Sequence, residues 1–151
     1  MTALDIFREY GRAAKAAEAI GEKILRREAM ATGATARPLS PDGGGRGSGD
    51  ASMRLVEYVG NIEDLRAQLR DAERRRENLA ACCVYLAELL PTASGDYLLR
   101  RYVQRKSMGM IAREMGCSES TVKRIREEAE RQAAGVVILR WDGEHLPILA
   151  T

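Results

Sequence analysis

The chain has 151 residues, of which 30% are charged and only 5% are aromatic, and its formal net charge is +2. So few aromatic residues argue against a sheet-rich core and favour long helices. No run reaches the roughly 18 apolar residues of a membrane span, and the charged N-terminus lacks the apolar centre of a signal peptide. We therefore expect an all-α protein of the cytoplasm that does not contact a membrane.

The first predicted element, in residues 1–33, is a long helix from about Ala3 to Met30. Its alanines favour a helix but each buries little area, so we expect this helix to need a partner. Apolar residues recur at the steps of three and four that mark one helix face, at Ile6, Tyr10, Ala13, Ala17, Ile20 and Ile24.

Residues 34–52 differ in composition from the segments on either side and are predicted to be a flexible linker. They contain Pro38, Pro41 and the run Gly43-Gly44-Gly45, and no apolar periodicity survives there. The alternative, a glycine-rich phosphate-binding loop, is disfavoured because no strand precedes the glycines and the Gly-Lys-Ser/Thr ending is absent.

Residues 53–90 have the longest regular pattern in the sequence. From Leu55 to Leu90, apolar residues alternate at steps of three and four, which is typical of a coiled coil or a helical hairpin. Arg76 interrupts this stripe, and we expect its stem to lie along the seam while its charge reaches solvent. The helix can pair with the N-terminal helix, with a second copy or with both; we favour an intrachain hairpin that also dimerises.

Residues 95–134 are predicted to be a three- to four-helix domain that contains a helix-turn-helix. Pro91 ends the long helix, residues 92–95 are expected to be a turn, and a helix begins at Asp96. Two short helices then meet at Gly116, because glycine readily takes the left-handed conformation that ends a helix and Ser118 can cap the next one. The expected core of this domain consists of Leu99, Tyr102, Ile111, Met115, Val122 and Ile125.

The second helix of the motif, residues 118–131, has the composition of a helix that reads a DNA major groove. Such helices contact bases mainly through their N-terminal residues. The simpler alternative is a helical hairpin whose charges are merely solvated. The predicted DNA-binding residues are Arg113, Ser118, Glu119, Ser120, Thr121, Lys123, Arg124 and Glu127.

The charge of this domain bears on how many copies act together. Residues 95–134 contain nine Lys/Arg and six Asp/Glu, a net charge of +3. Since affinity for duplex DNA rises with the number of phosphates neutralised, one copy should bind weakly. We expect a homo-oligomer, with a dimer favoured.

The stretch from Asp96 to Ala129 resembles region 4, the DNA-binding region of bacterial sigma factors. The resemblance implies that Glu119, Ser120, Lys123 and Arg124 contact bases. The sequence departs from the family pattern at Ser107-Met108-Gly109-Met110, where acidic residues are common, and Gly109 should weaken the start of that helix. The matching residues are Leu98-Leu99-Arg100-Arg101-Tyr102, Ile111-Ala112-Arg113-Glu114-Met115-Gly116, Ser118, Thr121-Val122 and Ile125.

The order of elements along the whole chain is similar to that of the sigma-like regulators of phages and prophages, of the RinA and ArpU type. These regulators have an N-terminal helix, a Gly/Pro-rich break, a long helix and then the sigma-like module. The resemblance implies an activator of late-gene transcription in a bacterial host cell. The sequence has no counterpart of the sigma regions that bind the upstream half of the core promoter, so we do not expect a complete initiation factor.

Residues 135–151 are predicted to form a short β-hairpin tail. Residues 136–141 are mostly β-branched or apolar, Asp142-Gly143 is a dipeptide common in hairpin turns, and residues up to Leu149 can return as a second strand. Pro147 restricts that arm to a sheet edge. Alternatively, Trp141 is an anchor for a partner.

Catalysis and metal binding are not expected. The three cysteines, Cys82, Cys83 and Cys117, lack the spacing of a metal site or a disulfide scaffold, and His145 is the only histidine. No nucleophile stands with a suitable base. We therefore expect no enzyme activity, no metal and no cofactor.

Three functions remain. The first is a transcription regulator that reads DNA with residues 118–131 and oligomerises, or contacts RNA polymerase, through its long helices. The second is a DNA-packaging subunit similar to a phage small terminase, which would form a ring. The third is an interaction protein that acts on RNA polymerase or another partner without reading DNA.

Overall fold

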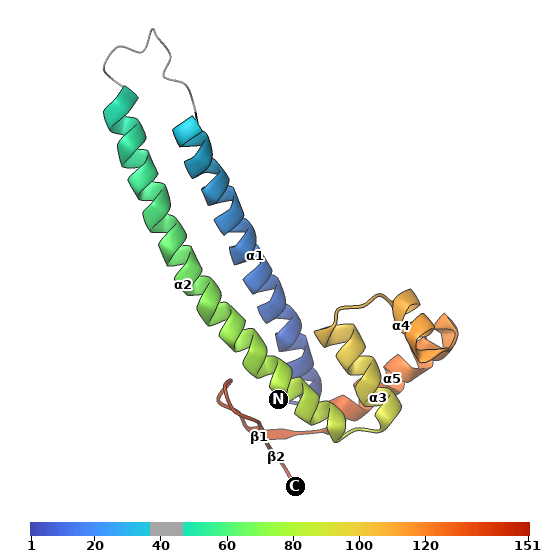
Figure 1. Ribbon diagram of the computed structural model, residues 1–151. Helices are drawn as coiled ribbons and strands as arrows, with labels where there is room; N and C mark the ends of the chain where they lie inside the picture. Colours follow the sequence, from blue (N-terminus) through green and yellow to red (C-terminus); the bar gives the residue numbers. More distant parts are fainter. Residues whose placement is uncertain (37–46) are drawn as a thin grey trace. The chain divides into compact units, whose positions relative to one another are not determined.

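The protein is described by a computed structural model that covers residues 1–36 and 47–151, with side chains described for residues 1–33 and 59–151. The chain is mostly helical and ends in a small two-stranded sheet (Figure 1). The expected all-α fold with a short C-terminal hairpin is confirmed. The elements in chain order are α1 (Ala3–Ala36), α2 (Gly47–Glu88), α3 (Thr92–Leu98), the π-helical turn η1 (Leu99–Val103), α4 (Met108–Met115), α5 (Glu119–Gly135), β1 (Ile138–Arg140) and β2 (Ile148–Leu149).

The two long helices extend further than the sequence predicted. Helix α1 continues to Ala36 and α2 already begins at Gly47, so both helices extend into residues 34–52, which were expected to be a linker. The middle of that stretch, residues 37–46, lies outside the described residues.

The long helices pair within the chain, which was one of the arrangements left open by the sequence. Glu9 of α1 accepts a hydrogen bond from Arg75 of α2 at 2.9 Å, and Glu28 accepts one from Arg66 at 2.9 Å. The residue numbers rise on one helix as they fall on the other, so the pairing is antiparallel. The charge of Arg76 was expected to reach solvent, but it is held against α1: its Nε donates to the Tyr10 hydroxyl at 3.1 Å, and its guanidinium lies 5.8 Å from the Tyr10 ring centroid.

The chain divides into two compact units that cut across the predicted segments. One unit contains residues 1–15 and 74–151, and the other contains residues 16–73. The first unit therefore joins the beginning of α1, the end of α2 and every later element. Its core comes from all of these parts, and its largest fully buried side chains are Ile6, Phe7, Leu79, Cys82, Cys83, Leu86, Tyr97, Leu98, Ile111 and Val122.

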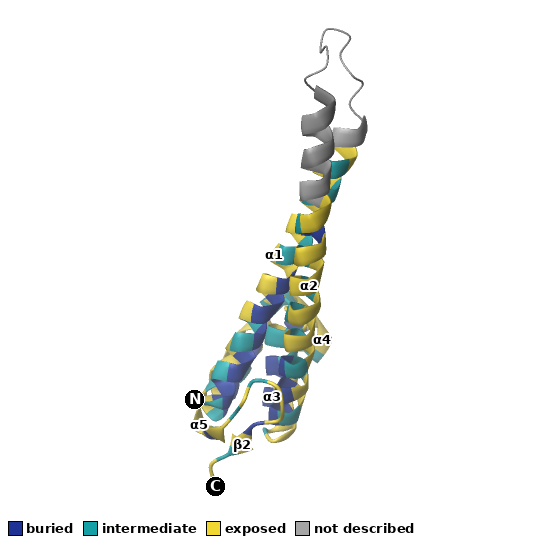
Figure 2. Cartoon of the chain, turned by 90° about the vertical axis from the view of Figure 1, so that its left-hand side faces the viewer, coloured by how far each residue is buried: buried dark blue, intermediate teal, exposed yellow. Residues whose placement is uncertain are grey.

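The second unit buries much less. Among its described side chains, the hydrophobic residues Ala17, Ile24 and Ile62 are buried, whereas Leu25 and Val59 are exposed. Figure 2 shows the contrast as short blue stretches among yellow along the helices of this unit. Two helices with so few buried residues gain little hydrophobic stabilisation from each other.

Residues 92–95 correct one prediction, because they are helical and do not form a turn. Helix α3 begins directly after Pro91, which occupies its N-cap position, and the turn is confined to Leu89 and Leu90. Gly95 is needed here for close packing: a Cβ atom at this position would stand 2.5 Å from the carbonyl oxygen of Ala87. The glycine that suggested a turn instead lets α3 approach the end of α2.

Helix α3 runs into η1, a π-helical turn in which the Gln104 N–H donates to the Leu99 carbonyl at 2.9 Å. A π turn holds an extra residue and so redirects the side chains that follow it. Tyr102 of this turn packs against Phe7 of α1, with ring centroids 6.0 Å apart, and its hydroxyl lies 3.4 Å from a carboxylate oxygen of Glu130. The π turn thereby links the first helix of the chain to α5.

The C-terminal tail forms an antiparallel sheet in which Ile138 pairs with Leu149 and Arg140 pairs with Ile148. The start of the chain extends this sheet, because the Ile138 N–H donates to the Met1 carbonyl at 2.9 Å and Thr2 forms a bridge with Val137.

Trp141 is half-buried against the core of its own unit, and its indole N–H donates to the His145 carbonyl at 3.0 Å. The structure therefore gives Trp141 a packing role within the chain.

Candidate nucleic-acid interface

The predicted helix-turn-helix consists of α4, a turn at Gly116 to Ser118, and α5. Gly116 has φ 66° and ψ 37°, the left-handed conformation expected for a residue that ends a helix, and the Cys117 N–H donates to the Ala112 carbonyl at 3.0 Å. Ser118 is extended, and its Oγ accepts the Thr121 N–H at 3.2 Å. The predicted roles of Gly116 and Ser118 are confirmed.

The start of α4 is better defined than its sequence suggested. Ser107 is the N-cap, and its Oγ accepts the Met110 N–H at 3.3 Å. Gly109 follows in the first turn, where a Cβ atom would lie 3.1 Å from Oε1 of Glu119. A side chain at position 109 would therefore require the Glu119 carboxylate to shift slightly. The capping role of Ser107 was missed, although a serine directly before an apolar helical segment is a recognised N-cap signal.

The motif is held by buried residues from both of its helices. Ile111 and Ala112 of α4, and Val122 of α5, are buried. Of the six residues that were predicted to form the core, Ile111 and Val122 are fully buried, while Leu99, Tyr102, Met115 and Ile125 pack against the core and are only partly buried. The rest of the buried core is supplied by distant residues such as Phe7 and Leu79, which the local pattern did not indicate.

All eight predicted DNA-binding residues are exposed, and we call them the motif surface: Arg113, Ser118, Glu119, Ser120, Thr121, Lys123, Arg124 and Glu127. Arg113 comes from the last turn of α4, and the other residues cover the start of α5. Ser120, Lys123, Arg124 and Glu127 are spaced by one, three or four residues, so they share one face of α5.

Three of the cations in residues 95–134 make no hydrogen bond or ion pair through their side chains within the described part of the chain. These three are Arg113, Lys123 and Arg124, and all belong to the motif surface. The other six of the nine Lys/Arg residues are engaged within the protein. Arg126 pairs with Glu130 at 3.2 Å and Arg131 with Glu128 at 2.5 Å, both further along α5.

The cations that precede α4 are engaged in holding that helix. Glu114 accepts hydrogen bonds from Lys106 and, at 2.6 Å, from Arg100. The Lys106 hydrogen bond, followed by that of Arg100, lowers the pKa of Glu114 below its ordinary value. Arg101 donates to the Lys106 carbonyl at 3.0 Å, which fixes the loop before α4. Charges outside the motif surface are thus used to build the motif.

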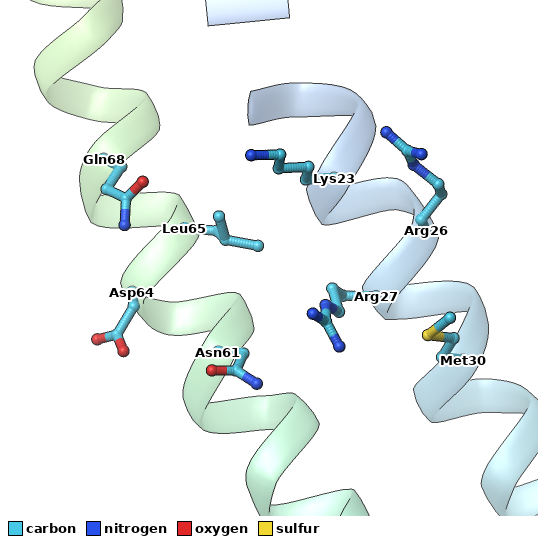
Figure 3. A pocket seen from close by; sticks show the side chains of 8 residues that line it. All are labelled: Lys23, Arg26, Arg27, Met30, Asn61, Asp64, Leu65 and Gln68. Atoms are coloured by element: carbon cyan, nitrogen blue, oxygen red, sulfur yellow. The ribbon is translucent and has the colours of Figure 1, made fainter. Parts of the chain in front are cut away.

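A second polar region lies on the other unit, where an open groove of about 520 Å³ runs between α1 and α2 (Figure 3). Lys23, Arg26 and Arg27 line it from α1, and Asp64 of α2 is the acidic residue of the lining. No group of three or more His, Cys, Asp or Glu side chains that suits a metal ion lies among the described residues. The groove has the mixed polar lining of a solvated helix pair.

Comparisons of the chain with protein-family models, with curated proteins and with solved structures find no match. Within the described residues, no helix is long and apolar enough to cross a membrane.

Proposed function

We propose that this protein is a sequence-specific DNA-binding regulator of transcription, which acts on late genes of a phage or prophage and reads the major groove with α5. The observation that carries the proposal is the placement of its cations. Of the nine Lys/Arg residues in 95–134, the three without a partner in the described chain are Arg113, Lys123 and Arg124, and all three lie on the exposed surface of a capped helix-turn-helix.

The chemistry of the motif surface suits a DNA groove. Arg124 and Lys123 can donate to the O6 and N7 atoms of guanine, Ser120 suits either base of a pair, and Glu119 can accept from the cytosine amino group. Arg113, on the preceding helix, suits a phosphate contact that positions the motif without specifying sequence. The first N–H groups of α5 lie at the same end of the helix and favour a nearby phosphate.

The small number of free cations sets the expected strength and salt dependence. If the three cations each neutralise one phosphate, the logarithm of the binding constant falls with the logarithm of salt concentration with a slope of about −3 per copy. One copy therefore binds weakly at physiological salt. The proposed active form is a homo-oligomer, and a dimer doubles this slope.

The proposal is tested by binding of the whole chain to DNA from upstream of phage late genes, measured by fluorescence anisotropy against scrambled DNA. Lys123→Ala and Arg124→Ala are each expected to cost about 1–3 kcal/mol of specific binding if they contact bases. The matched control is Arg131→Ala, which removes the same charge from the same helix at a residue that pairs with Glu128. Unchanged binding in both variants, or equal loss in the control, contradicts the proposal.

The other functions differ in observables that do not depend on these variants. A ring of eight or more copies would indicate DNA packaging, and the absence of DNA binding even at low salt would indicate a protein that acts only on other proteins. Contact with RNA polymerase through the long helices stays a prediction, tested by pull-down of purified polymerase with the chain.

A further inference from the structure

The small C-terminal sheet has one buried face and one exposed face. Ile138 and Leu149, which form a pair, pack against the core of the unit. The exposed side is apolar, with relative exposures from 50% to 71%, and Leu139 is the most exposed of its residues. We call this set of exposed residues the tail patch: Val137, Leu139, Leu146 and Ile148.

An irregularity in the strand pairing gathers the tail patch on one side. Between Ile138 and Arg140 the register shifts, so that Leu139 and Arg140 together oppose Ile148. Such a bulge turns two neighbouring side chains toward the same face of a sheet. The strands therefore present an apolar face to solvent, although their opposite face already packs against the core. Clustered apolar surface of this kind marks an interaction site.

The edge of the sheet is a poor place for a partner strand. Pro147 directly precedes β2, is buried, and has no N–H to donate to another strand. Proline at a sheet edge is one of the ways in which proteins prevent strand addition. A partner of this sheet therefore packs on the face that carries the tail patch.

We propose that the tail patch is the surface through which two copies of this chain associate. The argument for a second copy is the charge at the patch. Arg140 lies opposite Ile148, and Glu144 lies in the loop between the strands. Both are exposed, and within the described residues neither side chain makes a hydrogen bond or an ion pair.

The positive charge of Arg140 and the negative charge of Glu144, which acts on His145 through space but forms no ion pair within the described residues, make the surface complementary to itself. In a two-fold pairing, Arg140 of each copy meets Glu144 of the other. A uniformly acidic or basic partner would satisfy only one of these charges. Asp142 and His145, the remaining charged groups of the loop, already pair with each other at 2.7 Å.

The tail follows α5 directly, so its pairing would also set the separation of two motif surfaces. Helix α5 has 17 residues and is therefore roughly 25 Å long. Two such helices that meet at their C-terminal ends place their N-terminal ends up to about 50 Å apart, and inclined helices reach the 34 Å between successive major grooves. Only this spacing rests on the proposed function; the association itself requires no DNA.

The test is the mass of the whole chain in the absence of DNA, measured by sedimentation equilibrium. The chain has a mass of 16.7 kDa, so we expect twice this mass, and Leu139→Glu is expected to raise the dissociation constant at least tenfold. The matched control is Leu25→Glu, the same change at a leucine that is 66% exposed in the other unit, and it is expected to remain dimeric. Circular dichroism establishes that both variants are folded.

A second pair of variants tests the charges. Arg140→Glu is expected to weaken association, and the addition of Glu144→Arg is expected to restore it, because each copy then carries the reversed pair. The proposal is overturned if the wild-type chain is monomeric at about 100 μM or forms a ring. It is also overturned if Leu25→Glu dissociates the dimer and Leu139→Glu does not, or if the double variant does not restore association. If the tail patch instead binds a different protein, the wild-type chain is monomeric in this assay. Because DNA is absent from the assay, loss of DNA binding and loss of association are distinguished.

Discussion

Four cations of α5 are used in two different ways. Lys123 and Arg124 have no partner within the described residues, whereas Arg126 and Arg131, which lie further along the helix, are paired with glutamates on the same helix. Exposed pairs of this kind stabilise a helix only slightly, but they hold the charge in place. The difference teaches that exposure alone cannot select candidate binding residues, because all four side chains are exposed; the proposed function rests on which of these charges lack a partner within the described residues.

The largest expected effect removes the support beneath the motif surface. Ile111 is fully buried between α4 and the rest of the core, so Ile111→Ala is expected to lower the free energy of unfolding by about 2–5 kcal/mol. The neighbouring Met110 is half exposed, and Met110→Ala is the control, with an expected change within about 0.5 kcal/mol. Urea denaturation of both variants is the measurement. Equal effects would mean that α4 does not pack as described.

A smaller effect is expected at the helix cap. Ser118→Ala removes the acceptor of the Thr121 N–H and is expected to lower the free energy of unfolding by about 1 kcal/mol. Ser120 lies two residues further on, is exposed and makes no capping contact, so Ser120→Ala should leave stability nearly unchanged while it weakens DNA binding. Thermal unfolding and DNA titration of both variants separate the two roles. A stable Ser118→Ala variant would contradict the capping role.

The paired charges around Glu114 predict that the stability of the fold depends on pH. Because Lys106 and Arg100 lower the pKa of Glu114, its ion pairs stabilise the fold above its ordinary pKa of 4.5 and are lost as pH falls through the lower folded value. Wild type is therefore expected to be more stable than Glu114→Gln at about pH 7 and equally stable at about pH 3. Urea denaturation at both pH values measures this. A difference that persists unchanged in acid would show that Glu114 acts through packing and not through charge.

The smallest effect concerns the tail, which also holds a paired charge. Asp142 hydrogen-bonds and attracts His145, and this raises the pKa of His145 above its ordinary value of 6.5. The Asp142–His145 pair therefore stabilises the fold below pH 6.5, and this contribution is lost as pH rises through the pKa of His145 in the folded state. Since His145 is the only histidine, its ring protons give a single NMR titration curve. Asp142→Asn should return the pKa toward 6.5, and a wild-type pKa at or below that value would contradict the pairing.

The sequence predicts the parts of the molecule that depend on neighbouring residues. Gly116 and Ser118 act within four residues of their partners, so the turn and the start of α5 follow from local chemistry. The exposure of the motif surface follows from the helical period of Val122 and Ile125.

The rest could not be predicted because it depends on contacts between distant residues. The Phe7–Tyr102 contact has no signal in either segment. Gly95 was interpreted as a turn residue, yet its value lies in the close approach to Ala87, which only the packed structure shows. The lack of partners at Arg113, Lys123 and Arg124 within the described residues is likewise a property of the fold, since sequence spacing does not say which exposed charges find a partner.

The unit that contains the helix-turn-helix is built from the first 15 residues and the last 78. During synthesis on the ribosome, residues 1–15 emerge well before their partners Tyr102 and Val136, and at typical elongation rates the delay is on the order of ten seconds. Ile6, Phe7 and Tyr10 stay without their final packing throughout this interval. We therefore expect the core to close only after α5 has emerged, so that nascent chains cut short before α5 hold their N-terminal helix in a state that proteases can reach.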